Sequence, residues 1–171
     1  KHWVRSLPKR AGQREATPAL FAPVALDRIR EVAARESCWR DSGSRVAAHS
    51  LRIAVKRFRY TIQSFLPELY SGWKKELKRM QDSLGDIHDF DVLRIWLVKV
   101  VRNDSLDHAA VQVWLARIAK ARRERVERYK KVVSRGGKHA VVRSPVLWEQ
   151  WRGEIESLVA PNSPAHGESS A

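Results

Sequence analysis

The apolar residues of this chain recur with the period of an α-helix, and this periodicity limits the possible folds more than any other feature of the sequence. In the second segment, for example, Leu51, Val55 and Phe58 share one face at about 100° per residue. No segment shows the apolar–polar alternation and hairpin turns that are typical of strands. The periodicity predicts helices over residues 22–36, 45–69, 73–101, 106–134 and 145–160. Their short connections favour an antiparallel all-α bundle with long central helices.

Glycine, proline and hydroxyl residues mark the expected ends of these helices. Ser44 follows Gly43 and is a predicted N-cap of the second helix. The stretch "SCWRDSGSR", residues 37–45, is a predicted loop. Pro67 is expected to bend or end the second helix, because its ring clashes with the preceding turn. Residues 70–73, "YSGW", are then expected to form a short turn before the third helix.

The chain is predicted to contain one helical domain with irregular ends. Residues 1–20 carry Pro and Gly among basic side chains, which indicates an arm or linker. Residues 21–160 form the predicted domain, and the Pro-, Gly- and Ser-rich residues 161–171 form a predicted disordered tail. The chain begins with Lys rather than Met, so we expect it to be a fragment of a longer protein.

An excess of positive charge restricts the classes of partner. The chain has 33 Lys and Arg against 19 Asp and Glu, a net charge of +14, which predicts an anionic partner such as nucleic acid, another polyanion or an acidic membrane. Its single cysteine, Cys38, excludes an intrachain disulfide framework and fits a reducing compartment. No apolar run approaches the roughly 20 residues needed to span a bilayer, and no membrane partner is expected.

The segment "HSLRIAVKRFRY", residues 49–60, sorts its positive charge onto one face of the second helix. The members of this row, spaced three, four and three residues apart, are His49, Arg52, Lys56 and Arg59. Gln63 continues the row, and Arg57 lies to one side. Like charges at this spacing destabilise a helix by a few tenths of a kcal/mol per pair, and no acid lies within residues 49–67. A linear polyanion would relieve this repulsion, and a solvated basic face is the alternative.

The next helix supplies further cations and then a group of acids. The cations of its first half are Lys74, Lys75, Lys78 and Arg79. The carboxylates of its second half are Asp82, Asp86, Asp89 and Asp91. Antiparallel packing would bring these carboxylates near His49 and Arg52, where we expect them to orient the basic side chains through salt bridges. Gly85 costs about 1 kcal/mol relative to Ala in a helix, which suggests close approach of another helix backbone or of a ligand.

Two stretches carry a resemblance to a known family. "HSLRIAVKRFRYTIQSF" followed by "LKRMQDSLGDIHDFDVL" resembles the CHAD domain, the conserved histidine α-helical domain. The matching positions of the first stretch are His49, Leu51, Arg52, Ile53, Lys56, Arg57, Arg59 and Tyr60. Those of the second are Leu77, Lys78, Gln81, Asp82, Leu84, Gly85 and Asp89. The resemblance is strong over residues 45–93, extends to 22–36, and beyond 106 rests on helical character alone.

The resemblance implies two related four-helix halves around a basic cavity that binds inorganic polyphosphate. The motif occurs once here, in a form more like the second half of such a domain, so the other half is expected to lie outside this sequence or to come from a second chain. The implied location is the cytoplasm or polyphosphate granules. No cofactor, metal or catalytic residue is expected, since the sequence offers no nucleophile–base pair and no phosphate-binding glycine loop.

The basic residues divide into expected phosphate contacts and supporting groups. The expected direct contacts are Arg52, Lys56, Arg59 and Lys78. A second tier comprises Arg45, Arg57, Lys74, Lys75 and Arg79. His49 is expected either to donate to phosphate or to hydrogen-bond a carboxylate such as Asp89. Tyr60 is expected to be a packing residue with a polar tip, and Gln63, Asp82 and Asp89 are expected to support the site.

Three other functions remain open. "IHDFD" contains the His-Asp pair of HD phosphohydrolases, which would need further ligands from His49, His108, Asp89 and Asp91. "KARRERVERYKK" resembles a basic helix that binds nucleic acid, although Glu124 and Glu127 interrupt its charge, and no recognised nucleic-acid-binding motif is present. The third alternative is a helical interaction module, such as a homodimer, with an interface built from Trp73, Trp96, Trp114, Trp148 and Trp151. Most of these tryptophans are instead expected in the core.

Overall fold

The computed structural model describes residues 16–103, 108–134 and 146–159, and all its regular structure in these ranges is helical. The helices are α1 (Ala16–Ser42), α2 (Arg45–Phe65), α3 (Pro67–Asn103), α4 (His108–Val133) and α5 (Val146–Ser157). The structure therefore confirms the predicted all-α bundle with long central helices. The predicted tail and most of the predicted arm lie outside the described residues.

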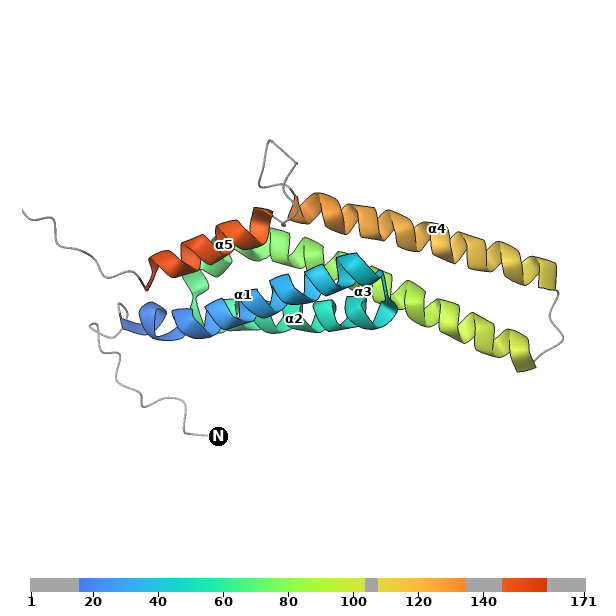
Figure 1. Ribbon diagram of the computed structural model, residues 1–171, viewed down its shortest axis with the longest axis horizontal. Helices are drawn as coiled ribbons and strands as arrows, with labels where there is room; N and C mark the ends of the chain where they lie inside the picture. The colour runs from blue at the N-terminus through green and yellow to red at the C-terminus, as the bar shows by residue number, and fades with distance from the viewer. Residues whose placement is uncertain (1–15, 104–107, 135–145, 160–171) are drawn as a thin grey trace, which may run out of the picture.

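Helix α3 is the central element of the arrangement. It packs against α2 on one side and against α4 on the other, while α1 packs against α2, and α5 packs mainly against α1. The second half of α3 and the first half of α4 project as a two-helix hairpin beyond the ends of α1 and α2 (Figure 1). The rest of the molecule is a compact bundle in which α5 covers the start of α3.

Helix α1 is longer at both ends than the sequence predicted. Residues 16–20 belong to it rather than to a basic arm, and residues 37–42 belong to it rather than to a loop. Trp39 is only 6% exposed and packs edge-on against Tyr129 of α4, and this burial stabilises the additional turns. The helix stops at Gly43, whose φ of +58° is in the left-handed region and whose N–H donates to the carbonyl of Trp39 at 2.7 Å.

The junction of α2 and α3 lies at Pro67, as expected, but it takes a different form. The hydroxyl of Ser44 accepts the backbone N–H of Ala47 at 3.1 Å and confirms the predicted N-cap of α2. Helix α2 ends at Phe65, and α3 starts directly at Pro67, because proline is preorganised for the first turn of a helix and needs no N–H there. The predicted turn at residues 70–73 is therefore wrong, since these residues are helical.

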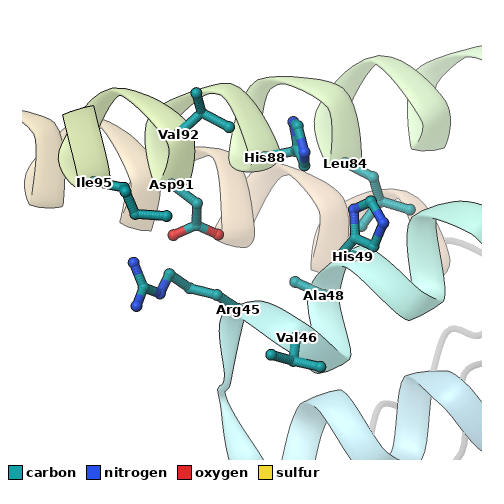
Figure 2. Close-up of a pocket in the computed structure, with 9 residues that line it drawn as sticks. All are labelled: Arg45, Val46, Ala48, His49, Leu84, His88, Asp91, Val92 and Ile95. Carbon is teal, nitrogen blue, oxygen red and sulfur yellow. The ribbon is translucent and has the colours of Figure 1, made fainter.

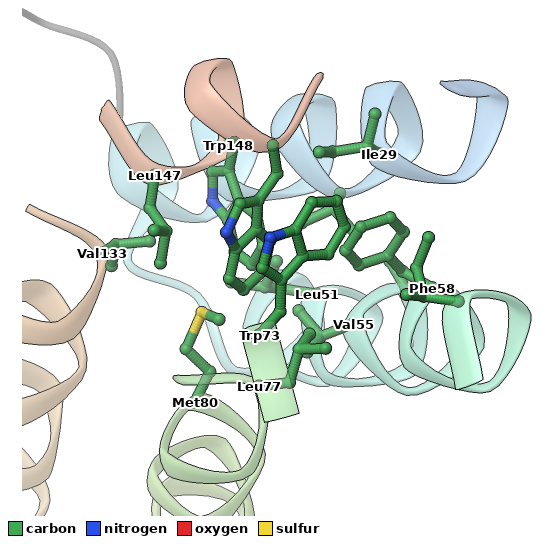
Figure 3. Close-up of a cluster of buried hydrophobic side chains, with 14 of the residues drawn as sticks. Ile29, Leu51, Val55, Phe58, Trp73, Leu77, Met80, Val133, Leu147 and Trp148 are labelled. Carbon is green, nitrogen blue, oxygen red and sulfur yellow. The ribbon is translucent and has the colours of Figure 1, made fainter. Parts of the chain in front are cut away.

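An aromatic cluster fills the core between α1, α2, α5 and the start of α3 (Figure 3). Trp151 stacks on Trp73 with ring centroids 4.7 Å apart, and Trp148 meets Trp151 edge-on at 5.3 Å. Phe58 of α2 lies 6.0 Å from Trp151, between centroids. The predicted apolar stripe of α2 faces this cluster with four fully buried side chains, Leu51, Val55, Phe58 and Ile62.

Two other tryptophans do not reach the core, although the sequence suggested a core role for most of them. Trp96 of α3 and Trp114 of α4 are 59% and 55% exposed. Trp96 belongs to the second half of α3 and Trp114 to the first half of α4, the segments that project beyond the ends of α1 and α2 (Figure 1). Of the five tryptophans considered, Trp73, Trp148 and Trp151 are buried, which confirms the core role predicted for most of them.

One carboxyl group is buried in the core beside the aromatic cluster. Glu36 of α1 is 6% exposed and accepts the indole N–H of Trp148 at 2.5 Å, which links α1 to α5. Burial raises the pKa of Glu36 to about 7, and the Trp148 hydrogen bond and the charge of Arg40 offset this only in part. Burial also raises the pKa of Tyr129, whose hydroxyl has no hydrogen-bond partner in the described part of the chain.

We expect the Glu36 carboxyl to make the fold less stable at alkaline than at mildly acidic pH. Its folded-state pKa of about 7 lies above the unfolded value of 4.5, so folding favours the protonated form. The contribution of Glu36 to the free energy of unfolding is therefore fully present below pH 4.5 and is lost as the pH rises to about 7. The total loss is up to about 3 kcal/mol.

Urea denaturation at about pH 5 and about pH 8 checks this expectation, with Glu36→Gln as the matched variant. The amide oxygen of the variant still accepts the Trp148 N–H but does not titrate. The wild-type protein should lose more stability than the variant between these pH values. An identical pH dependence in both proteins would contradict the assignment.

Candidate functional site

One face of α2 carries the predicted basic row: His49, Arg52, Lys56 and Arg59. His49 and Lys56 are exposed, whereas Arg52 and Arg59 are half-buried. The row is about 15 Å long at the rise of an α-helix. Gln63 continues it as a further exposed side chain. Because α2 is a regular helix held by its buried apolar face, the row is kept in line at the surface.

Arg59 is fixed in place by side chains of α3. Its guanidinium donates to the side-chain oxygen of Gln81 and to the hydroxyl of Tyr70, the latter at 3.3 Å. These contacts hold the charge in position before a ligand binds, which lowers the entropy cost of binding. The sequence reasoning did not include either partner in the site. Gln81 was noted only as a position that matches the motif. Tyr70 was expected in a turn rather than on a helix, so its contact with Arg59 was not predicted.

Two contacts set the register of α2 against α3. The ring of His49 lies 5.4 Å from that of His88, between centroids, and Arg59 contacts Gln81. The segment of α3 between these contacts therefore lies beside the middle of the basic row, and it contains Gly85. A Cβ placed on Gly85 would meet nothing within 4 Å. The expected close approach of another helix backbone is therefore wrong for the described residues, and Gly85 leaves open space beside the row.

The cations at the start of α3 are all exposed and extend the positive surface: Lys74, Lys75, Lys78 and Arg79. Lys78 pairs with Asp82 at 2.8 Å. Arg79 lies at a longer distance of 3.9 Å from Glu76. Within the ranges that the structure describes, Lys74 and Lys75 have no ion-pair partner, and they keep their full charge available to a ligand.

The carboxylates of α3 do not pair with the basic row, contrary to expectation. Asp86 pairs with Nε of Arg125 at 2.7 Å, and Asp91 accepts from Nε of Arg122 at 2.8 Å. Both arginines belong to α4, which packs along the side of α3 opposite α2. Asp86 and Asp91 therefore offset the charge of two arginines of α4, and they do not offset the positive charge of the basic row.

The structure also lacks the hydrogen bond between His49 and Asp89 that was one of the two expected roles of His49. Oδ1 of Asp89 lies 3.3 Å from Nδ1 of its neighbour His88. His49 and His88 instead face a hollow of about 310 Å³, together with Arg45, the buried Asp91 and several apolar side chains (Figure 2). This hollow lies at the start of α2, at one end of the basic row.

Two predicted site residues lie to the side of the row. Arg57 faces α1, where its guanidinium is 3.6 Å from the carboxylate of Glu31. Tyr60 is 53% exposed, and the ammonium of Lys56 lies 5.8 Å from the centre of its ring, a cation–π contact. Tyr60 therefore packs on a member of the row at the surface rather than in the core.

The described residues contain neither a cluster of metal ligands nor a membrane-spanning helix. No group of three or more His, Cys, Asp or Glu side chains is placed there so that it could hold a metal ion. The adjacent His88 and Asp89 thus lack the further ligands that an HD-type site would need within those ranges. None of the described helices combines the length and the apolar character needed to cross a membrane.

These features define the class of the protein as an all-α helical domain, with a row of cationic side chains on its second helix and further cations at the start of its third. The family model of the CHAD domain matches residues 1–98, more than half of the 171-residue chain. The chain belongs to the CHAD domain family, which confirms the resemblance seen in the sequence. The match ends within α3, so α4 and α5 lie outside it. No curated protein and no solved structure matches the chain.

Proposed function

We propose that this domain binds inorganic polyphosphate along the basic row and the adjoining cations of α3, and that it does so without transforming the ligand. One observation carries the proposal: among the described residues, no carboxylate of α3 forms an ion pair with the row, since Asp86 and Asp91 pair with α4, Asp82 pairs with Lys78, and Asp89 lies beside His88. Membership of the CHAD family supports the same ligand. Aligned cations repel one another, and a linear polyanion removes that repulsion.

The chemistry of the side chains suits a phosphate chain. Arg52 offers a planar guanidinium fork that binds two oxygens of one phosphate, and Arg59 offers the N–H groups left over from its contacts with Gln81 and Tyr70. Lys56 and Lys78 act as movable point charges. Arg59 is already held by α3, so it serves as the fixed end of the row. The second-tier cations around this path are Arg45, Arg57, Lys74, Lys75 and Arg79. His49 is the remaining donor of the row.

Such binding would localise a protein to polyphosphate in the cytoplasm or in granules, or dock an attached enzyme domain there. His49, Lys56 and the cations at the start of α3 are exposed. A second CHAD half or a second copy of this chain is the partner we propose to complete a cavity around the ligand. Incubation with long-chain polyphosphate tests the absence of catalysis, since gel electrophoresis should show no shortening of the chains.

A competition experiment at fixed salt separates polyphosphate from nucleic acid. The domain should bind long-chain polyphosphate, and double-stranded DNA at equal concentration of charge should leave that complex intact. The reason is spacing: the row presents cations along a single line, whereas duplex DNA spreads its phosphates over two strands. Displacement of polyphosphate by DNA would contradict the proposal and favour a nucleic-acid-binding protein.

A further inference from the structure

A second hollow lies on the other side of α3, between α3 and α4. It has a volume of about 400 Å³. Its lining comprises Arg79, Asp82, Ser83 and Asp86 of α3, and Arg128, Lys131 and Val132 of α4. The residues from α4 lie beyond the part of the chain that the family model matches.

The two carboxylates in this hollow are already neutralised from outside it. Asp82 pairs with Lys78 at 2.8 Å, and Asp86 pairs with Arg125 at 2.7 Å. Neither Lys78 nor Arg125 lines the hollow. The charge that a ligand would meet is therefore set by the remaining cations of the lining.

Three cations remain once the carboxylates are paired. Arg128 and Lys131 are exposed and have no ion-pair partner within the described ranges, and Arg79 is 3.9 Å from its nearest acid, Glu76. Ser83 adds a hydroxyl group that can donate a hydrogen bond. Guanidinium, ammonium and hydroxyl donors around one hollow are the groups that bind phosphate oxygens.

Lys78 lies on the flank of α3 between the basic row and this hollow. It is three residues from Gln81, which contacts Arg59 of the row. Lys78 and Arg79 are neighbours around the helix at about 100° per residue, with Lys78 toward the row and Arg79 lining the hollow. Lys78 contacts Asp82, which itself lines the hollow, so it lies between the two sites. The row lies on α2 and the hollow lies beyond α3, so a phosphate chain that occupies both must span more than one interaxial spacing of about 8–10 Å.

We infer that the groove between α3 and α4 is a second polyphosphate subsite, which continues the path from the basic row across Lys78. This inference rests on the proposed function and adds Arg128 and Lys131 to the residues that bind the ligand. A long chain occupies the row and the groove together, whereas a chain of three phosphates occupies only one of them. The domain therefore binds long chains more tightly than short ones.

Removing the two cations of α4 tests the subsite. In the variant with Arg128→Ala and Lys131→Ala, the affinity of the full chain for long polyphosphate should fall by roughly tenfold to hundredfold, and the slope of log K against log salt should fall by about 1.4. The affinity for tripolyphosphate should change by less than about threefold, because the basic row remains intact. Circular dichroism should show an unchanged helical content, since both side chains are exposed.

The matched control carries Arg123→Ala and Lys130→Ala, which remove the same charge from exposed positions of α4 that do not line the hollow. If the groove variant loses no more affinity for long chains than this control, the second subsite is wrong while the proposed function stands. If the wild-type domain binds no polyphosphate of either length, the proposed function itself fails. A larger loss in the groove variant, confined to long chains, supports the subsite.

Discussion

Replacing Trp151 by alanine should lower the free energy of unfolding by about 3–5 kcal/mol. Trp151 is 2% exposed and occupies the centre of the aromatic cluster, with Trp73, Trp148 and Phe58 at centroid distances of 4.7, 5.3 and 6.0 Å. The alanine removes these contacts and leaves a cavity that four helices border and that none of them can fill alone. A domain of this size has a total stability of about 5–15 kcal/mol, so the loss would be a large part of it.

Denaturation by urea, followed by circular dichroism, measures this loss. Trp114→Ala is the matched control, because Trp114 is 55% exposed on the hairpin, where the guanidinium of Arg117 lies 5.2 Å from the centre of its ring. The control should lose less than about 1 kcal/mol. Equal losses in the two variants would mean that α5 does not form part of the core.

Local patterns in the sequence were sufficient to predict the helices and the basic row. The apolar period of residues 49–66 placed Leu51 and Phe58 in the core, and the same period placed Arg52 and Lys56 together on another face. Ser44 was identified as an N-cap because that role depends on the residues next to it. These features are set by neighbours within one or two turns, so no knowledge of the packing was needed.

Features that depend on packing between helices were not predictable in the same way. Asp86 and Asp91 were expected to face α2, but they pair with arginines of α4. Local sequence patterns do not predict that α4 packs beside α3. Trp96 has the apolar character of a core residue, yet it is exposed because α3 extends beyond the bundle. The anchoring of Arg59 by Tyr70 likewise became visible only when α3 was found to begin at Pro67.

The largest effect on binding is expected from the combined variant Arg52→Ala, Lys56→Ala and Arg59→Ala. It removes three of the four members of the basic row and leaves the apolar face of α2 unchanged. Each charge-assisted contact with a phosphate contributes roughly 1.5–3 kcal/mol, and screening by solvent reduces this at exposed positions such as Lys56. The affinity for long-chain polyphosphate should therefore fall by at least about 100-fold.

A matched control removes the same charge from a different face of the molecule. Its substitutions are at exposed arginines of α1 and α5, which do not border the basic row: Arg30→Ala, Arg35→Ala and Arg152→Ala. Because the net charge falls equally in both variants, their difference reports the placement of the cations rather than their number. The control should lose less than about tenfold in affinity.

Isothermal titration calorimetry of the wild-type domain and these two variants with long-chain polyphosphate, at several salt concentrations, tests the central claim most directly. The row variant should lose at least about 100-fold in affinity, and its slope of log K against log salt should be smaller than that of the wild type by about 2. The control should keep an affinity close to that of the wild type. An unchanged affinity in the row variant, or an equal loss in the control, would show that the basic row is not where the polyanion binds.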